Sequence, residues 1–375
     1  MLIMPVVALF YNENGLSELN IFLLQAIYSV SVAIMEIPSG YMADILGRKK
    51  TLVLGAILGT AGFAIYSMST SFSGFLLAEI ILGIGGSFIS GADTAMLFDS
   101  LEAMRLRHRY LQLEGRITSF GNFAETIAAV CGGLIAAYFS YRAVYICQTL
   151  VAALAIPASL LLLEPPKGER IKQPGITHIL SICKQSLFVN KKLSSAIFQS
   201  SVTGTATLCM AWTSQIYFVN QGFDEVIITP LWVTLNLTVA IIAAYAAATQ
   251  KFLGEKLSLS LIIIFIPAAY VFLGQFHIIP AIITLYLFYG VRGYATPVLK
   301  DLTNKHCSSS VRATVFSIRS LIIRLSFALL GPMIGWITIA TSLSTALTTA
   351  GILLLFFSSI SGYFLFKQRI SQPIV

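Results

Sequence analysis

Charged side chains inside long apolar runs are the residues of this sequence whose types could do chemistry. A charge at the centre of a bilayer costs about 2.5 to 3.5 kcal/mol, so in a membrane-spanning run each must face protein or water. Shielded carboxylates can load and release protons, and arginines can receive anionic groups or pair with acids. The acids precede the arginines along the chain: Glu36, Glu79, Asp93, Glu125, then Arg292, Arg319 and Arg324.

Two interpretations stay open for the residues deepest in these runs. Glu79 and Glu125 either carry a coupling proton or take part in a buried ion pair or a hydrogen bond between helices. Arg324, near the middle of its run, either binds an anionic substrate group or neutralises a carboxylate such as Glu125. Asp93 and Arg319 lie nearer the cytoplasmic ends of their runs, where we expect a gate.

Uncharged polar residues occur in the later apolar runs. Any one of them is as consistent with helix packing as with a binding site, but together they suit a solute that is part apolar and part polar. These cavity candidates are Gln199, Gln215 and Asn236, with the aromatic Trp212.

The elements that must position these residues are membrane-spanning helices. Apolar residues make up 57% of the 375 residues, charged residues only 11%, and a span needs roughly 20 apolar residues. The first run is short, so either its helix is short or the true start lies upstream, and we expect the second. Twelve spans are predicted near residues 1–10, 21–42, 51–69, 73–97, 117–139, 143–163, 193–218, 231–249, 257–276, 278–298, 313–337 and 343–366.

A polar linker at 164–192 separates an N-terminal six-helix half, 1–163, from a C-terminal half, 193–375. With this linker in the cytoplasm, most of the 24 Lys and Arg fall on that side, as the positive-inside rule requires. The net charge of +8 therefore reflects topology, and no nucleic-acid partner is indicated. We expect a multi-pass protein of a plasma membrane, the inner membrane of a bacterium, with the linker cytoplasmic.

The two halves resemble each other at three matching places. Residues 91–99 are echoed by 293–301, residues 116–120 by 312–316, and the loop 46–49 by 253–256. Internal repeats of this kind are typical of transporter folds. The five scattered cysteines indicate neither a disulfide framework nor a metal site.

The loop between the second and third spans carries a charged motif made of Gly40, Asp44, Gly47, Arg48 and Lys49. Asp44 can face the positive N-terminal end of another helix, and the eleventh span begins on the same side at Arg312. Arg48 can pair with Asp99 and so hold a cytoplasmic gate shut. The alternative is a turn whose charges only set topology.

This loop resembles the signature loop of the major facilitator superfamily, with Ile45 in place of the motif's first arginine. The resemblance implies an all-α fold of twelve membrane helices in two pseudo-symmetric six-helix halves, with the third helix of each three-helix unit outermost. Glu79 stands where many proton-coupled members carry an arginine. The Gly-Pro that exporters carry in span five is missing, although span eleven contains Gly331-Pro332.

We therefore predict a secondary active transporter that works by alternating access, a proton-coupled exporter of a drug, metabolite or chelator. The alternative is proton-coupled uptake of an organic anion or zwitterion. A non-transporting membrane sensor or scaffold is a hypothesis of another class. We expect a monomer without cofactor or metal, and no enzyme, because no nucleophile, base and orienting group occur together.

Overall fold

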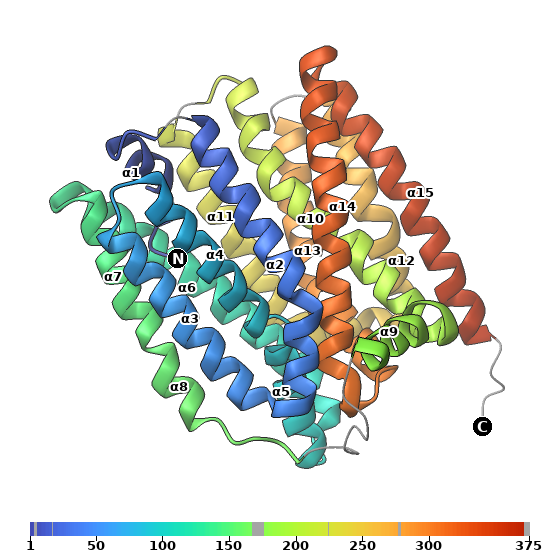
Figure 1. Ribbon diagram of the computed structural model, residues 1–375. Coiled ribbons are helices and arrows are strands. Elements are labelled where there is room, and N and C mark those ends of the chain that lie inside the picture. The colour runs from blue at the N-terminus through green and yellow to red at the C-terminus, as the bar shows by residue number, and fades with distance from the viewer. Residues whose placement is uncertain (4–5, 17, 167–175, 224, 277–278, 371–375) are drawn as a thin grey trace. The chain divides into compact units, whose positions relative to one another are not determined.

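The computed structural model describes residues 1–375 except 4–5, 17, 167–175, 224, 277–278 and 371–375 (Figure 1). Throughout the described residues the regular elements are helices, because a backbone in lipid must satisfy its own hydrogen bonds. The first half contains α1 (Val7–Glu13), α2 (Glu18–Leu46), α3 (Arg48–Met68), α4 (Phe72–Ile89), α5 (Ala92–Ala103), η1 (Arg107–Arg109), α6 (Tyr110–Tyr138), α7 (Tyr141–Ala153) and α8 (Ala155–Leu161). The linker and second half contain α9 (Ile176–Lys184), the π-helix η2 (Gln185–Val189), α10 (Lys191–Asn220), α11 (Glu225–Ala244), α12 (Ala246–Gln275), α13 (Ile279–Lys305), η3 (Ser309–Val311), α14 (Arg312–Ala340) and α15 (Leu343–Ile370).

Eight helical segments in the described part of the chain are long and apolar enough to cross a membrane. They are Leu23–Leu46, Arg48–Met68, Phe72–Ala103, Arg107–Tyr138, Tyr141–Leu161, Ala246–Gln275, Ser309–Ala340 and Leu343–Lys367. Helices α10 and α13, of 30 and 27 residues, are also long enough at 1.5 Å per residue. Helix α1 has 7 residues.

The helices form two compact units. The first comprises Met1–Arg107, Ala124–Cys183 and Ser308–Leu321, and the second comprises His108–Phe123, Lys184–Cys307 and Ile322–Val375. Each unit thus includes the beginning of one helix from the other sequence half: α14 begins in the first unit, and α6 begins in the second. The predicted division into sequence halves 1–163 and 193–375, with a linker at 164–192, stays a prediction.

Equivalent helices have equivalent neighbours inside each unit. In the first unit α4 packs against α2 and α3, and α3 packs against α7. In the second unit α13 packs against α11 and α12, and α12 packs against α15. The same packing from unrelated side chains is what a duplicated three-dimensional unit produces, and it matches the pseudo-symmetry expected from the sequence repeats.

Two predicted boundaries differ from the structure at glycines. The predicted fourth span is broken at Ser90 and Gly91, so that α4 ends there and α5 carries its last part. Helix α12 begins at Ala246, ahead of the predicted loop 253–256, which is instead a kink at Gly254 with φ 73° and ψ 161°. Gly47, its repeat partner, has φ 113° and ψ 149°, a conformation in which a Cβ is strained.

Candidate functional site: a buried charge network at the start of α14

Small residues bring three helices together at the beginning of α14. Ala43 of α2, Ala92 and Ala95 of α5, and Ala313 of α14 are all fully buried in one cluster. A Cβ at Gly40 would lie 2.9 Å from the Ala313 carbonyl oxygen, which is closer than real side chains approach. The absence of side chains here lets the backbones touch, and the charged groups next to them are therefore forced to meet.

Asp44 caps the N-terminus of α14. Its carboxylate accepts hydrogen bonds from the Ala313 amide at 3.2 Å, the Thr314 amide at 3.0 Å and the Thr314 hydroxyl at 2.7 Å. The first amides of a helix have no intrahelical acceptor, and the helix dipole favours negative charge at this end. The sequence interpretation of Asp44 as facing a helix N-terminus is therefore confirmed as a contact.

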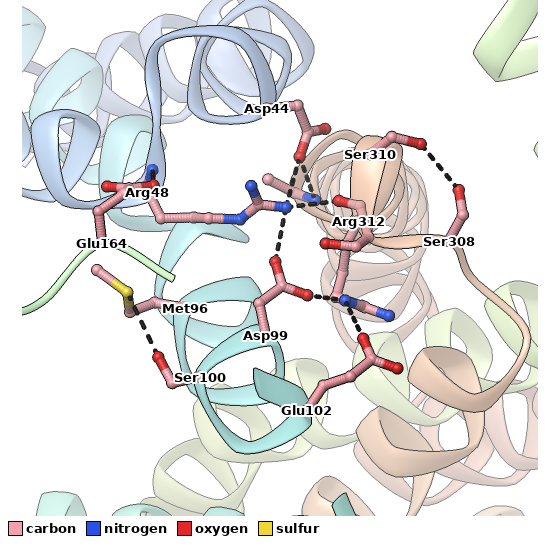
Figure 2. A network of polar contacts seen from close by, with 12 residues as sticks. Asp44, Arg48, Met96, Asp99, Ser100, Glu102, Glu164, Ser308, Ser310 and Arg312 are labelled. Atoms are coloured by element: carbon pink, nitrogen blue, oxygen red, sulfur yellow. Dashed lines mark hydrogen bonds and ion pairs between the residues drawn. The ribbon is translucent and has the colours of Figure 1, made fainter. Parts of the chain in front are cut away.

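Arg48 extends from the start of α3 into the same network, which Figure 2 shows. Its guanidinium forms an ion pair with Asp99 at 2.7 Å and a longer one with Asp44 at 3.4 Å. It also donates to the carbonyl oxygen of Ser309, just ahead of α14, at 2.5 Å. The pairing of Arg48 with Asp99 that the sequence suggested is present, and it is buried.

Arg312 completes the network and was not among the predicted site residues. It pairs with the other oxygen of Asp99, and its guanidinium lies 4.1 Å from the centre of the Phe98 ring. Glu102, largely exposed, lies 3.8 Å away. The sequence signal was its place as the first residue of a span on the same side as Asp99, which had been used only for the repeat and for the helix end that faces Asp44.

The network balances its charges. The acids Asp44 and Asp99 and the bases Arg48 and Arg312 are each 8% exposed or less. Buried charges are costly unless they are paired with good geometry, and removal of one partner leaves an uncompensated charge. The four side chains therefore hold α2, α3, α5 and the start of α14 as one interdependent set.

Glu164 was missed as a site residue because it was assigned to the linker. Its two carboxylate oxygens accept the amides of Arg48 and Lys49, each at 2.8 Å, and so cap the start of α3. A Cβ at Gly47 would lie 2.9 Å from the Glu164 carboxyl carbon. Lys49 contributes its backbone to this cap. The only hint in the sequence was an acid directly after the sixth span, near a basic loop.

A second polar centre surrounds Glu79 in the first unit. The Glu79 Oε1 atom accepts the hydroxyl of Tyr66 at 2.6 Å, the hydroxyl of Tyr11 at 3.1 Å and the amide of Gln25 at 3.2 Å. The two tyrosine hydroxyls also contact each other. Aromatic rings fill the surrounding space: Phe10, Phe75 and Tyr145.

Arg142 holds the short helix α1 that supplies Tyr11. It donates to the carbonyl of Ser67 at 2.7 Å and to the side chain of Asn14 at 3.1 Å, and it lies 5.5 Å from the centre of the Phe10 ring. Its contacts connect the end of α3 with the end of α1, and thereby place Tyr11 against Glu79.

Comparison with known proteins shows the family to which the chain belongs. The sequence profile of the Major Facilitator Superfamily matches residues 1–330. The chain belongs to this superfamily. This is a family of membrane transporters, and the match confirms the fold class and the family expected from the signature loop.

Individual relatives of the superfamily are distant. The quinolone resistance protein NorA of Staphylococcus aureus (strain MRSA252) is 22% identical over 227 residues, which are 60% of this chain and 57% of NorA. The putative multidrug resistance protein MdtD of Escherichia coli O9:H4 (strain HS) is 25% identical over 151 residues, 40% of this chain and 31% of MdtD. The matched regions thus span little more than half of these curated relatives, or less.

Solved superfamily structures share the fold. The human organic anion transporter MFSD10 superimposes with a TM-score of 0.74 at 17% identity, covering 95% of this chain and 88% of that one. The E. coli fucose:proton symporter FucP gives a TM-score of 0.74 at 15% identity, covering 96% and 94%. At such identities the likeness establishes the fold alone.

The other charged residues predicted inside the membrane spans make none of the contacts described above with the α14 network or with Glu79. Asp93 is exposed in the first turn of α5, where its side chain accepts the Thr94 amide. Glu125 on α6 and Arg319 on α14 are partly buried. Arg324 is also partly buried but belongs to the second unit, so its predicted pairing with Glu125 stays a prediction.

Two of the predicted residues of the second half have contacts typical of helix packing, and the role of the others stays a prediction. Gln199 is fully buried and donates to Ser358 of α15 at 3.0 Å, which favours the packing interpretation. Asn236 is buried and donates to the Trp232 carbonyl one turn earlier on α11, so it too is used within its helix. Arg292 lies 5.3 Å from the Tyr289 ring centre. The side chain of Gln215 lies outside the described residues.

No group of three or more His, Cys, Asp or Glu in the described ranges is arranged to hold a metal ion. The five cysteines are free thiols.

Proposed function

We propose that this chain is a secondary active transporter that exports a small organic solute in exchange for protons. In this proposal Glu79 carries the proton, and the network of Asp44, Arg48, Asp99 and Arg312 is the cytoplasmic gate. The observation that carries the proposal is the environment of Glu79. It is an ionisable group inside a membrane span of a transporter, where such groups are functional by default.

The packing around Glu79 favours a proton as the species that it binds. Glu79 is 5% exposed, Tyr11 and Tyr66 are 0% and 2% exposed, and aromatic rings pack around the two tyrosines. All three donors address Oε1, so a proton on Oε2 disturbs none of these hydrogen bonds. Gln25 is exposed and connects the carboxylate with the surface of α2, which offers a route for the proton.

The gate assignment is supported by where the network lies in the chain. It ties the start of α14, from the second sequence half, to α2, α3 and α5 of the first. In alternating access one half rocks against the other, so such contacts must break when the cytoplasmic side opens. Because the two acids and two bases of the network pair with one another, they stabilise the closed state and their contacts break together when it opens.

Export is supported by the names of the relatives. NorA is named for quinolone resistance and MdtD for multidrug resistance, and removal of a drug from the cell is one way to cause resistance. A drug, metabolite or chelator with apolar and polar parts is the proposed cargo. The proposed location is the bacterial inner membrane, with the basic loops and the linker in the cytoplasm and the chain acting as a monomer.

Uptake of an organic anion or zwitterion is the second candidate. Arg292, Arg319 and Arg324 are partly buried within membrane helices, and a guanidinium recognises carboxylates and phosphates well. Two superfamily structures of the same fold are named as an organic anion transporter and a fucose:proton symporter.

Vesicle orientation separates these functions. Inverted vesicles with an acidic interior should accumulate a quinolone if the chain exports it in exchange for protons. Right-side-out vesicles with an acidic exterior should accumulate fluorescein, as an organic-anion probe, if it works by proton-coupled uptake. Accumulation only in right-side-out vesicles would overturn export. If neither vesicle accumulates any probe of a drug and metabolite panel, the sensor or scaffold hypothesis is favoured.

The Glu79→Gln variant tests the proton site. We expect it to lose about tenfold or more of the accumulation driven by the pH gradient, because the amide cannot load a proton, while exchange of labelled for unlabelled solute continues. Glu13→Gln makes the same chemical change on an exposed carboxylate at the end of α1 and should behave like the unaltered chain. Accumulation by Glu79→Gln with an unchanged pH dependence would remove Glu79 from the proton path.

A further inference from the structure

The start of α6 forms a polar contact of its own in the second unit. The segment His108–Phe123 packs with second-half helices, whereas α6 from Ala124 onward belongs to the first unit. A Cβ at Gly115 would collide with the carbonyl oxygen of Ala243 at the end of α11, so the two backbones touch directly. One continuous helix therefore has its two parts in two different units.

A buried ion pair anchors this helix start. Lys300 of α13 lies 2.7 Å from the Oε1 atom of Glu114, and Tyr110 donates to the Oε2 atom at 3.1 Å. Glu114 is 3% exposed and Tyr110 fully buried. Both oxygens of the carboxylate are engaged, which is the condition under which a buried acid is tolerated.

This contact resembles the α14 network in position but has the opposite polarity. At the start of α14, the helix that begins there carries the base Arg312, and the helix that it contacts, α5, carries the acid Asp99. At the start of α6, the helix that begins there carries the acid Glu114, and the helix that it contacts, α13, carries the base Lys300. The sequence repeat pairs other residues, Asp99 with Asp301 and Arg312 with Arg116, so sequence matching does not find this pair.

We propose that Glu114 and Lys300 form a second cytoplasmic latch, which must open together with the Asp44–Arg48–Asp99–Arg312 network. This inference rests on the proposed alternating access of the two halves. In this proposal α6 moves with its own sequence half, so the contacts of its first turns with α11 and α13 break when the two halves rock apart. The start of α14 is attracted by Asp99 but would be repelled by Lys300, and the start of α6 is attracted by Lys300 but would be repelled by Asp99. The charges therefore favour one closed arrangement over the exchanged one.

A cysteine at Ala246 reports on the latch. Ala246 is fully buried, and its Cβ lies 3.6 Å from the position of a Cβ at Gly115, so the start of α6 covers it. In a background in which the native cysteines are replaced by alanine, the rate of maleimide labelling at Ala246→Cys measures how often this cover opens. The measurement needs no substrate.

We expect Glu114→Gln and Lys300→Gln each to raise the labelling rate about tenfold or more, since each removes one charge of a pair whose acid is buried. The exchanged pair Glu114→Lys with Lys300→Glu should return the rate toward that of the background. Lys305→Gln is the matched control, because the exposed Lys305 pairs with Asp301 inside α13 itself and should leave labelling unchanged.

Three results would overturn the latch: unchanged labelling in both single variants, an exchanged pair that opens as much as the single variants, or equal opening in Lys305→Gln. Where a single variant is poorly folded, a well-folded exchanged pair with restored protection still supports a pairwise latch. A failure of proton-coupled export in the vesicle assays would leave these labelling rates unaffected, so the two proposals can fail separately.

Discussion

Replacement of Asp44 by asparagine should release the beginning of α14 while leaving the shape of the site almost unchanged. The carboxylate now accepts the amides of Ala313 and Thr314 and the Thr314 hydroxyl, and it lies 3.4 Å from Arg48. An asparagine keeps one acceptor oxygen. Its amide group points a donor at donors, and the charge that favoured the helix N-terminus and the guanidinium is lost.

The size of the effect follows from these contacts. Hydrogen bonds to a charged group are worth about 1.5 to 3 kcal/mol each, and breaking a buried ion pair by removing one partner costs about 3 to 5 kcal/mol. Since asparagine retains about one of the bonds, we expect a loss of about 3 kcal/mol, which corresponds to about a 100- to 200-fold change in the opening equilibrium.

Hydrogen–deuterium exchange measures this directly. The amides of Ala313 and Thr314 lie in the first turn of α14, where no intrahelical acceptor protects them, so Asp44 is their acceptor. In Asp44→Asn their exchange should accelerate about 100-fold, because local opening sets the rate. Exchange in the middle of α14 should not change.

Two weaker variants grade the response. Thr314→Val removes only the hydroxyl bond, about 1.5 kcal/mol at the lower end for a charged acceptor, and should accelerate exchange about 10- to 15-fold. Glu102→Gln changes a largely exposed acid that lies 3.8 Å from Arg312, and its effect should be within about threefold. An increase below about threefold in Asp44→Asn, or an order of effects that does not follow this series, would refute the reasoning.

Three further variants test other parts of the site. Arg312→Lys keeps the charge but loses the planar guanidinium that pairs with Asp99 and lies on the Phe98 ring, so we expect a lower thermal-unfolding midpoint and faster exchange at the α14 start; an unchanged midpoint would show that the charge alone suffices. Gly40→Ala places a methyl group against the backbone of Ala313 and should cost about 1 to 3 kcal/mol in stability, whereas a stable, unshifted variant would mean that α14 yields easily. Glu164→Gln weakens the cap of α3 by about 1 kcal/mol, which should appear as faster amide exchange at residues 48–49 and nowhere in α14.

Much of the fold could be predicted from the sequence because it depends on local properties. Apolar runs of span length predict membrane helices, since the bilayer imposes length and the backbone must satisfy itself. Gly47 has a φ of 113°, a backbone conformation that glycine adopts without strain. The pair Arg48 and Asp99 was found because both belong to recognisable positions, a signature loop and the end of a repeat.

The remaining site depended on the tertiary structure. Arg312 lies 213 residues from Asp99, and the sequence does not say which of many cationic residues reaches that carboxylate. The three donors to Glu79 come from different helices, so its apolar run alone left a proton site and a packing contact equally open.

Glu164 and the pair of Glu114 and Lys300 show the same limit. Glu164 reads as a linker residue until the turn at Gly47 is seen against it, and Glu114 lies two residues from the position that the repeat would select. Local propensity and span length thus determined which segments are helices. The distribution of Lys and Arg along the chain predicted which side faces the cytoplasm. Which charges meet was decided only by the close approach of glycine and alanine backbones, because that approach depends on packing between segments far apart in the chain.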